Sequence, residues 1–362
     1  MSKPISLAII GATGGVGSAF LAALPSIVLP PSTPRPQLIF LSRSKKQLYN
    51  KDYSPVSPED LASSSSPLLS LPDLAKYLST SPNPTVLVDN TSDQSVAEAY
   101  PLFLKSNISI ITPNKKAFSS PLPLWNAIFS AVTRTALVYH ESSVGAGLPI
   151  ISTLNDLVRT GDQVTRIEGV FSGTMSFLFN TFAPASESAS SPGKWSEIVG
   201  KAKAAGYTEP DPRDDLNGMD VARKCVILAR CAGLKVESTS SFPIQSLIPS
   251  ALESASSADE FMQKLPNHDD EMESYKTEAK KQGKVVRYVG KVDVENNKVS
   301  VGLEMVDQGS PIAGLKGSDN LICFYTKRYG SNPLVVQGAG AGNEVTAMGV
   351  LADLVKVIER LG

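Results

Sequence analysis

A glycine-rich turn near the N-terminus restricts the possible folds of this chain more than any other feature. Residues 11–17 read Gly-Ala-Thr-Gly-Gly-Val-Gly and lie between an apolar run at 5–10 and a helix-compatible stretch at 19–24. In a strand, turn and helix unit, glycines permit a tight turn, and backbone N–H groups at the helix N-terminus can then approach a pyrophosphate. An ordinary glycine-rich turn would explain neither the position nor the context. We therefore predict a dinucleotide-binding turn that uses Gly11, Thr13, Gly14, Gly15, Val16 and Gly17.

Three further short apolar runs have the composition of buried strands: 38–41, 86–88 and 108–111. Because helical stretches separate them, we predict a parallel sheet that helices cover on both faces. The fold class that follows is α/β, with a Rossmann-like doubly wound parallel sheet over residues 1–150. The proline-rich stretch 25–36 and the serine runs 63–66 and 186–191 are expected to be surface segments, because they have little apolar content for packing.

After about residue 150 the pattern changes, because no glycine turn leads from a strand into a helix there. Four stretches are predicted strands: 164–171, 285–292, 299–305 and 321–327. We therefore predict a second, α+β domain at 151–337 with a mixed or antiparallel sheet. The glycine-rich run 338–342 precedes a helical run at 344–361, so the segment 338–362 is expected to return to the first domain.

The charge balance and the cysteine count indicate the kind of partner and the compartment. The chain has 34 Lys and Arg against 35 Asp and Glu, so it offers no electrostatic surface for nucleic acid or an anionic membrane. A small-molecule partner is the better expectation. The N-terminal apolar run is too short for a secretion signal or a membrane span, and three cysteines are too few and too odd in number for a disulfide framework. We expect a soluble, cytoplasmic protein.

The residues after the second predicted strand bear on which dinucleotide is bound. NAD-specific proteins usually present an acidic residue there to the ribose 2'-hydroxyl, but this chain has Ser-Arg-Ser-Lys-Lys at 42–46 and no acid before Asp52. The guanidinium of Arg43 suits a 2'-phosphate by charge and by geometry. The sequence thus predicts a preference for NADP(H), with NAD(H) as a further cofactor. The alternative is a solvated basic turn.

Asp220 and Lys224 lie four residues apart on a predicted helix at 216–232, and so share one face of that helix. Such a pair on a solvent-exposed face contributes only about 0.2 to 0.5 kcal/mol to stability. Here the same stripe continues with Ile227 and Cys231, so the surroundings are partly apolar. A carboxylate and an ammonium group in such surroundings favour a pocket over a solvated helix face.

Three later segments have distinctive sequences: Thr-Pro-Asn-Lys-Lys-Ala at 112–117, Ser-Gly-Thr-Met-Ser-Phe at 172–177, and the long segment 206–224, which begins Gly-Tyr-Thr-Glu-Pro-Asp. They closely resemble segments of homoserine dehydrogenases. With the two glycine-rich runs the resemblance covers the chain from end to end, and it is to the short, monofunctional fungal type. The N-terminal turn departs from the family's common Gly-x-Gly-x-x-Gly by one extra residue.

The resemblance implies an NAD(P)-dependent oxidoreductase that interconverts L-aspartate 4-semialdehyde and L-homoserine, in the aspartate-derived pathway to threonine and methionine. It also implies a homodimer joined through the sheets of the second, catalytic domain. Reduction of an aldehyde by hydride creates an alkoxide, so the site needs a proton donor beside the oxygen. In the family the lysine that matches Lys224 donates and accepts this proton, and Asp220 orients it or contacts the substrate hydroxyl.

Other contacts are assigned by the resemblance together with residue chemistry. Lys115 follows a predicted strand, at the sheet edge where doubly wound sheets bind ligands. It matches a lysine between cofactor and substrate in the family, which implies a catalytic and cofactor-binding residue. The alternative is that the adjacent Lys116 has this role. Glu209 and Asp214 supply acidic groups for the substrate ammonium, whereas Asp211 and Asp215 are equally well explained as turn or cap residues. The remaining expected contacts are Thr174 and Gly206 for the substrate, and Thr91, Ser92 and Gly342 for the cofactor.

A glycine-interrupted segment at 140–148 reads His-Glu-Ser-Ser-Val-Gly-Ala-Gly-Leu. On its own it would be a connection between domains. The resemblance implies a structural monovalent cation, Na⁺ or K⁺, and hard oxygen ligands from a curled loop suit such an ion. The ligands implied are the side chain of Glu141 and the carbonyls of Val144, Ala146 and Leu148. His140 has no visible partner and is not expected to be catalytic.

Two alternatives remain from the residues alone. Aspartate-semialdehyde dehydrogenase has a similar glycine turn, but its chemistry requires an activated cysteine and a histidine base. Cys225 and Cys231 lie on the apolar helix and Cys323 in a predicted strand, so all three are expected to be packing residues. A non-catalytic NADP(H) sensor is the other alternative, and it would not need Lys224 or Lys115.

Overall fold

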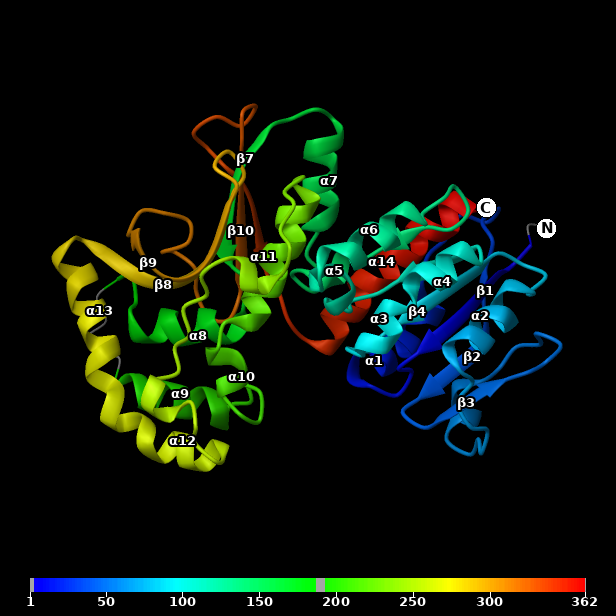
Figure 1. The fold of residues 1–362 in the computed structure, drawn as a ribbon, viewed down its shortest axis with the longest axis horizontal. Helices are drawn as coiled ribbons and strands as arrows, with labels where there is room; N and C mark the ends of the chain where they lie inside the picture. The colour runs from blue at the N-terminus through cyan, green and yellow to red at the C-terminus, as the bar shows by residue number, and fades with distance from the viewer. Residues whose placement is uncertain (1–2, 187–192, 362) are drawn as a thin grey trace. The chain divides into compact units, whose positions relative to one another are not determined.

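The computed structural model describes residues 3–186 and 193–361 and contains two units, each with its own sheet (Figure 1). The first unit combines Met1–Pro149 with Ala341–Gly362, and the second is Ile150–Gly340. Apart from Ser186, the predicted serine-rich surface segment at 186–191 lies outside the described residues.

The sheet of the first unit has the strand order β3-β2-β1-β4-β5-β6 among the described residues. Its strands are β1 Ile5–Ile10, β2 Pro36–Arg43, β3 Lys46–Tyr49, β4 Thr85–Asp89, β5 Ile108–Ile111 and β6 Val138–Tyr139. All neighbours pair in parallel except β3, which is antiparallel to β2. The predicted Rossmann-like fold class is confirmed. The short β3 was not predicted, because it has no apolar run and forms a tight hairpin directly after Arg43, which pairs with Lys46.

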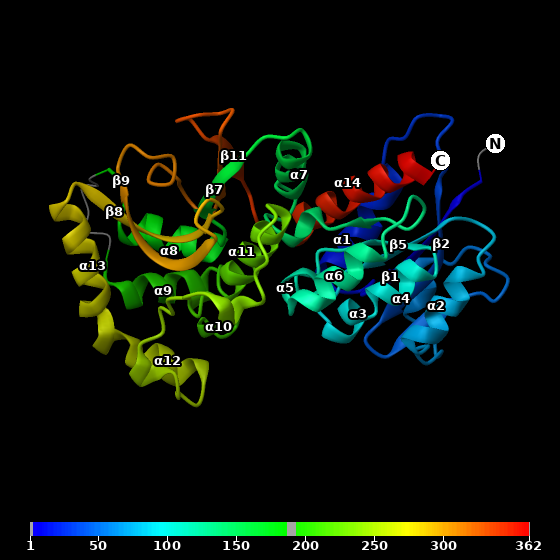
Figure 2. The ribbon, with the colours of Figure 1, turned by 45° about the horizontal axis from the view of Figure 1, so that its top comes forward.

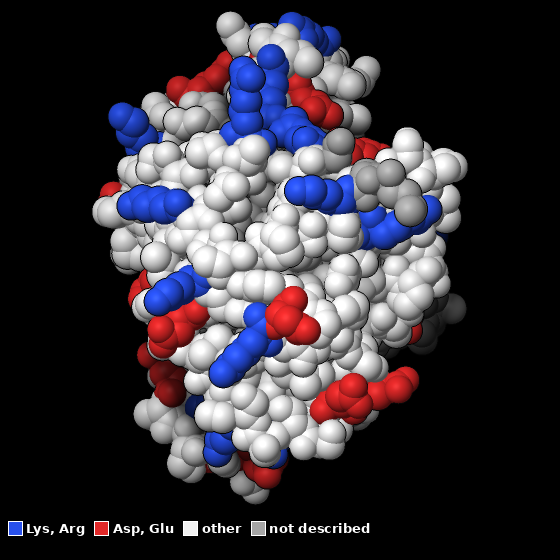
Figure 3. Space-filling view, turned by 90° about the vertical axis from the view of Figure 1, so that its right-hand side faces the viewer, with Lys and Arg blue, Asp and Glu red and all other residues white. Residues whose placement is uncertain are grey.

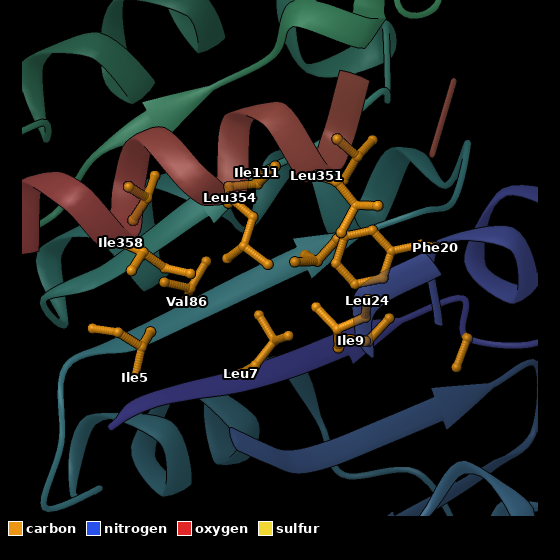
Figure 4. Packing of buried hydrophobic residues seen from close by; sticks show 14 of the residues in the cluster. Ile5, Leu7, Ile9, Phe20, Leu24, Val86, Ile111, Leu351, Leu354 and Ile358 are labelled. Carbon is orange, nitrogen blue, oxygen red and sulfur yellow. The ribbon is translucent and has the colours of Figure 1, made fainter. Parts of the chain in front are cut away.

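Helices α1 and α14 pack together over one face of this sheet. The helices of the first unit are α1 Gly15–Ala23, α2 Leu71–Ser79, α3 Gln94–Glu98, α4 Tyr100–Lys105, α5 Lys116–Ser119, α6 Leu122–Ser130 and α14 Asn343–Leu361. Because strand side chains alternate between faces, Ile5, Leu7 and Ile9 of β1 share one face, and they pack in the same core cluster as Leu354 of α14 (Figure 4). The segment after the second unit therefore completes the core of the first.

The second unit has a five-stranded antiparallel sheet in the order β11-β10-β7-β8-β9. Its strands are β7 Val164–Val170, β8 Lys284–Asp293, β9 Lys298–Asp307, β10 Asn320–Thr326 and β11 Leu334–Gly338. The four predicted strands are present. The sequence analysis missed β11, because this edge strand has only five residues and pairs with β10 alone.

Helices α8, α11 and α13 contact β8, which lies inside this sheet (Figure 2). The helices of the second unit are α7 Ile151–Arg159, α8 Gly173–Phe182, α9 Trp195–Ala204, α10 Arg213–Leu216, α11 Met219–Cys231, α12 Ala258–Lys264 and α13 Asp269–Lys281. This packing brings α11, which carries Lys224, against β8 and β9, and α8, which carries Thr174, against β7 and β8.

The predicted helix at 216–232 was wrong in its first turn. The chain forms α10, leaves the helix at Asn217 and Gly218, and begins α11 at Met219. Gly218 has a φ of +75°, and a Cβ there would lie 2.0 Å from the Tyr288 hydroxyl oxygen. Only glycine fits this left-handed conformation against a neighbouring ring, so the break in the helix is fixed by tertiary packing.

The two described surface segments, 25–36 and 63–66, differ in their contacts with the rest of the first unit. The proline-rich stretch 25–36 is mainly a loop, as predicted, although Leu29 is buried. The serine run 63–66 is attached to β3, because Ser64 Oγ donates to the Gln47 carbonyl and Gln47 N donates to the Ser66 carbonyl.

On the face in Figure 3, Lys and Arg side chains are interspersed with Asp and Glu and separated by uncharged surface. Within residues 3–186 and 193–361, no helix combines the length and the apolar character that crossing a membrane requires.

Candidate active site

The glycine turn connects β1 to α1 and leaves the start of the helix open. Gly11 has a φ of +80°, and a Cβ on Gly17 would lie 2.0 Å from the Gly11 carbonyl oxygen, so the turn packs tightly onto the first turn of α1. The N-cap residue Gly14 makes no side-chain capping bond, and Thr13, Gly14 and Gly15 are exposed, with Val16 partly buried. Uncapped N–H groups and the helix dipole at such an end favour a phosphate.

The strand order changes direction at the edge where this turn lies. From β1 the chain continues on one side to β2 and β3, and then crosses to β4, β5 and β6 on the other side. Ligands of open α/β sheets bind at such a switch point, beyond the carboxyl ends of the strands. Thr91 and Ser92 lie two and three residues after β4, and Lys115 lies four residues after β5 and immediately before α5. The first unit thus brings these three predicted residues to the same sheet edge as the glycine turn.

A buried carboxylate that the sequence analysis did not single out organises this edge. Asp89, the last residue of β4, has no exposed surface. Its Oδ1 accepts hydrogen bonds from Thr91 N and Oγ1 at 2.9 and 2.7 Å, and its Oδ2 accepts from the Tyr100 hydroxyl and from Asn114 Nδ2 at 3.2 Å. Burial raises the pKa of Asp89. The network ties the segment of Thr91 to Asn114, the neighbour of Lys115. Asp89 could have been found from the sequence, because it is a single acidic residue at the end of the apolar run of β4.

Arg43 ends β2 close to the glycine turn. The carbonyl of the preceding residue, Ser42, accepts a hydrogen bond from Ala12 N at 2.9 Å, which fixes the end of β2 against the turn. The Arg43 side chain is partly buried, and its guanidinium donates to the Ala62 carbonyl at 3.3 Å. A cationic group is therefore held at the end of β2, one residue after Ser42, whose carbonyl contacts the dinucleotide turn.

Gly342 lies directly before α14 in the same unit. It is exposed and has a φ of +113°. Its carbonyl accepts hydrogen bonds from both N and Oγ1 of Thr346, so it is integrated into the first turn of that helix.

In the second unit, Lys224 lies in a site that is largely closed to solvent. Its residue is only 6% exposed, its Nζ lies 2.7 Å from Asp220 Oδ2, and it donates to the Phe171 carbonyl at 2.6 Å. The Asp220 side chain is 43% exposed. Val221 and Cys225, on the adjoining part of α11, are buried. The pair is thus anchored in the protein at the lysine and open to solvent at the carboxylate.

Thr174 and the segment around Glu209 meet through Asp215. The Thr174 hydroxyl oxygen lies 2.6 Å from the Tyr207 carbonyl oxygen and 2.9 Å from Asp215 Oδ1, while Asp215 Oδ2 accepts a hydrogen bond from Glu209 N at 2.8 Å. Burial, and after it the charges of Glu209 and Asp220, raise the pKa of Asp215. Three carboxylates therefore lie close enough to influence one another, which suits an ammonium group.

The remaining predicted substrate residues, Asp214 and Gly206, lie on either side of Glu209 in the sequence. Asp214 is exposed. Gly206 ends α9, where Gly206 N donates to the Lys203 carbonyl and Tyr207 N to the Ala202 carbonyl, the two hydrogen bonds of a Schellman motif. The Tyr207 ring stacks on Phe177 of α8 with ring centroids 4.6 Å apart. Gly206 thus has a structural role as a helix terminator beside the segment that carries Thr174.

Asp211 and Asp215, which looked alike in sequence, have different environments. Asp211 forms a local pair with the Arg213 guanidinium, which holds its pKa below the usual value. Asp215 instead joins α8 to the Glu209 segment. Sequence spacing could not separate the two, because the partner of Asp215 on α8 is 41 residues away.

The predicted cation loop contains two consecutive residues with positive φ, Gly145 at +78° and Ala146 at +53°. Val144 and Ala146 are buried, Leu148 is partly buried, and the Glu141 residue is 5% exposed. Lys356 Nζ lies 3.6 Å from Glu141 Oε2. Within the described residues no cluster of three or more His, Cys, Asp or Glu side chains could hold a metal. The ligand set implied for this loop by the resemblance is one carboxylate with backbone carbonyls.

The histidine and the cysteines do not support the cysteine-dependent alternative. His140 is stacked on Phe118 with ring centroids 4.0 Å apart, and burial lowers its pKa to about 3. Burial also raises the pKa of Cys225 and of Cys323 to about 12. A thiolate is the nucleophile in thioester chemistry, so neither buried thiol is activated for it.

Comparison with known proteins identifies the same family over both units. The model of the homoserine dehydrogenase NAD-binding domain matches residues 13–141, and the homoserine dehydrogenase model matches residues 149–355. A homoserine dehydrogenase of Emericella nidulans is 60% identical, with 100% of each chain covered. One of Paracoccidioides brasiliensis is 59% identical, with 99% of each covered.

Solved structures agree in fold. A Candida auris protein of unknown function is 50% identical, with a TM-score of 0.93 and 99% of each chain covered. A hyperthermophilic archaeal homoserine dehydrogenase mutant in complex with NADPH is 20% identical, with a TM-score of 0.70 and coverage of 98% of this chain and 97% of that one. This second likeness concerns the fold.

Proposed function

The chain belongs to the homoserine dehydrogenase family, and from this premise we propose that Lys224 moves the proton in the interconversion of L-homoserine and L-aspartate 4-semialdehyde. The single observation that carries the proposal is the position of its Nζ, which is buried, 2.7 Å from Asp220 Oδ2 and 2.6 Å from the Phe171 carbonyl oxygen. An ammonium held this firmly has a defined direction toward a substrate oxygen, which efficient proton transfer requires.

A nicotinamide cofactor, when bound, would supply the hydride chemistry, and Lys224 would handle the proton of the reacting oxygen. For oxidation, neutral Lys224 takes the hydroxyl proton while the carbon loses hydride, and the carbonyl forms. For reduction, the Lys224 ammonium gives its proton to the oxygen that becomes the hydroxyl. Asp220 keeps the lysine oriented in both directions, because its carboxylate is in contact with Nζ.

The substrate's ammonium is proposed to bind at the carboxylates beside Thr174. Glu209 and Asp214 are exposed there, and Asp215 fixes the backbone of Glu209. Thr174 and Gly206 complete the substrate contacts. Opposite charge and hydrogen bonding to carboxylates are the interactions that an amino-acid ammonium needs.

The nicotinamide cofactor fits the residues of the first unit. Its pyrophosphate would lie on the glycine turn, at Gly11, Thr13, Gly14, Gly15, Val16 and Gly17, and further contacts would come from Thr91, Ser92, Lys115 and Gly342. The uncapped N-terminus of α1 supports this arrangement. We assign NADP(H) as the preferred cofactor, with NAD(H) also used, because Arg43 is held beside the turn. A hyperthermophilic archaeal homoserine dehydrogenase mutant with the same fold was solved in complex with NADPH.

Four further properties belong to the proposal. A monovalent cation, Na⁺ or K⁺, would be held by Glu141 and the carbonyls of Val144, Ala146 and Leu148, in a loop whose positive φ values curl the backbone. The protein would be a homodimer joined through the sheet of the second unit. It would act in the cytoplasm, in the pathway to threonine and methionine.

The test measures oxidation of L-homoserine with NADP⁺ and NAD⁺ side by side, from the absorbance of the reduced cofactor. We expect turnover with both, higher efficiency with NADP⁺, and loss of turnover in a folded Lys224→Ala variant. A Lys224→Ala protein with wild-type kcat would remove Lys224 from the mechanism. A wild-type protein that binds NADPH but does not turn over homoserine would point to the sensor.

A further inference from the structure

A fully buried amide shares its hydrogen-bond acceptor with the proposed catalytic lysine. Asn320 is the first residue of β10 and has no exposed surface. Its Nδ2 donates to the Phe171 carbonyl oxygen at 3.1 Å. The same oxygen accepts the hydrogen bond from Lys224 Nζ at 2.6 Å. A carbonyl oxygen has two lone pairs, so the amide and the lysine together use its full capacity.

The polarity of Asn320 is not explained by packing. Its Oδ1 has no hydrogen-bond partner among the described residues, and burial of an unpartnered acceptor is unfavourable. Asparagine is also depleted in strands. Leucine has a similar size and would fill this position without a desolvated oxygen. What asparagine supplies and leucine does not is the Nδ2 donor on the Phe171 carbonyl.

The segment that follows the neighbouring strand β11 leaves space for the Asn320 amide. A Cβ on Gly340 would lie 2.0 Å from Asn320 Nδ2 and 2.2 Å from its Cγ. Gly340 follows β11, whose last residue, Gly338, pairs with Asn320. Glycine at 340 therefore lets the backbone close over the amide. This gives the glycine-rich run at 338–342 a function apart from the cofactor.

We propose that Asn320 is a positioning residue for Lys224, acting through the Phe171 carbonyl, and that Gly340 keeps the amide in place. Phe171 lies between β7 and the start of α8, and its carbonyl oxygen accepts hydrogen bonds from the side chains of Lys224 and Asn320. The second donor fixes that oxygen, and the oxygen in turn fixes the direction of Nζ. The inference rests on the proposed role of Lys224 in proton transfer.

The experiment compares Asn320→Leu with Gly340→Ala, which retains the amide but displaces it. Asn180→Leu is the matched control, because Asn180 Nδ2 also donates to a backbone carbonyl of the same unit, but to that of Gly317 and to Ser176 Oγ rather than to that of Phe171. Homoserine oxidation is measured at saturating NADP⁺ in H₂O and in D₂O, with Lys224→Ala in parallel, and thermal unfolding reports whether each variant is folded.

We expect kcat to fall about fivefold to tenfold in Asn320→Leu, the effect of one lost hydrogen bond, with KM for homoserine changed about twofold or less. The solvent isotope effect on kcat should rise, because proton transfer becomes slower. Gly340→Ala should likewise lower kcat and raise the solvent isotope effect, and Asn180→Leu should change neither quantity.

Two results would overturn the inference. One is a folded Asn320→Leu with wild-type kcat and isotope effect, and the other is an equal loss in Asn180→Leu. If Asn320→Leu does not fold, Gly340→Ala takes its place: a folded Gly340→Ala with wild-type kcat and isotope effect, or an equal loss in Asn180→Leu, would overturn the inference. Turnover that survives in Lys224→Ala would instead reject the proposed function, so the two failures are distinguishable.

Discussion

Replacing Leu354 with alanine tests whether α14 belongs to the core of the first unit. Leu354 has no exposed surface and packs in a cluster with Leu7 and Phe20 (Figure 4). A Leu→Ala change in a core costs about 2 to 5 kcal/mol, because transfer energy is lost and a cavity remains. The neighbours on β1 are held in a sheet and cannot collapse into the space, so we expect about 3 kcal/mol.

The assay is thermal unfolding followed by calorimetry, with Leu102→Ala as control. Leu102, on α4 of the same unit, is 39% exposed, so the same truncation there should cost about 1 kcal/mol or less. For a unit of this size about 3 kcal/mol lowers Tm by about 6 to 12 °C. Saturating NADPH should recover part of the loss, because a ligand that binds only the folded unit stabilises it.

The reasoning would be refuted if Leu354→Ala lowered Tm no more than Leu102→Ala does. In that event α14 would contribute little to the core, and the proposed cofactor contact at Gly342, which precedes this helix, would lose its rigid support.

Three other predictions concern cofactor preference, substrate binding and thiol reactivity. Arg43→Glu should invert the preference for NADP⁺ over NAD⁺, because a carboxylate repels a 2'-phosphate and can bind a ribose hydroxyl; an unchanged ratio of kcat/KM would show that Arg43 is only a basic turn residue. Asp215→Asn should raise KM for homoserine about fivefold, the effect of one weakened contact, while Thr174 and Glu209 keep hydrogen-bond partners. The pKa of Asp215 is raised on folding, so its contribution to stability is full below pH 3.8 and is lost as the pH rises through its folded pKa. Asp215→Asn should therefore gain stability relative to wild type over that pH range. Urea titrations at several pH values measure this difference, and a variant that loses stability relative to wild type as the pH rises would contradict the prediction. Cys225 and Cys323, with pKa values of about 12, should not react with a thiol reagent at pH 8 in the native protein; fast labelling that abolishes turnover would reopen the cysteine-dependent alternative.

Features that depend on near neighbours in the chain could be predicted from the sequence alone. The strand, glycine turn and helix at the N-terminus could be predicted because apolar runs and glycine spacing are local. The same holds for Asp220 and Lys224, because residues four apart on a helix necessarily share a face. Edge strands β3 and β11 were missed, since a short strand with one partner needs little apolar sequence.

Tertiary structure decided how the functional groups are held. Asp89 gathers Thr91 and Asn114 because β4 and β5 lie side by side, which places residues 25 apart in contact. The Phe171 carbonyl meets Lys224 and Asn320 across separations of 53 and 149 residues. No period in the sequence encodes such a meeting, because it arises only when the sheet and its helices pack. The pairing of Lys224 with Asp220 was therefore predictable from the sequence, while the other partners of Lys224 were set by the fold.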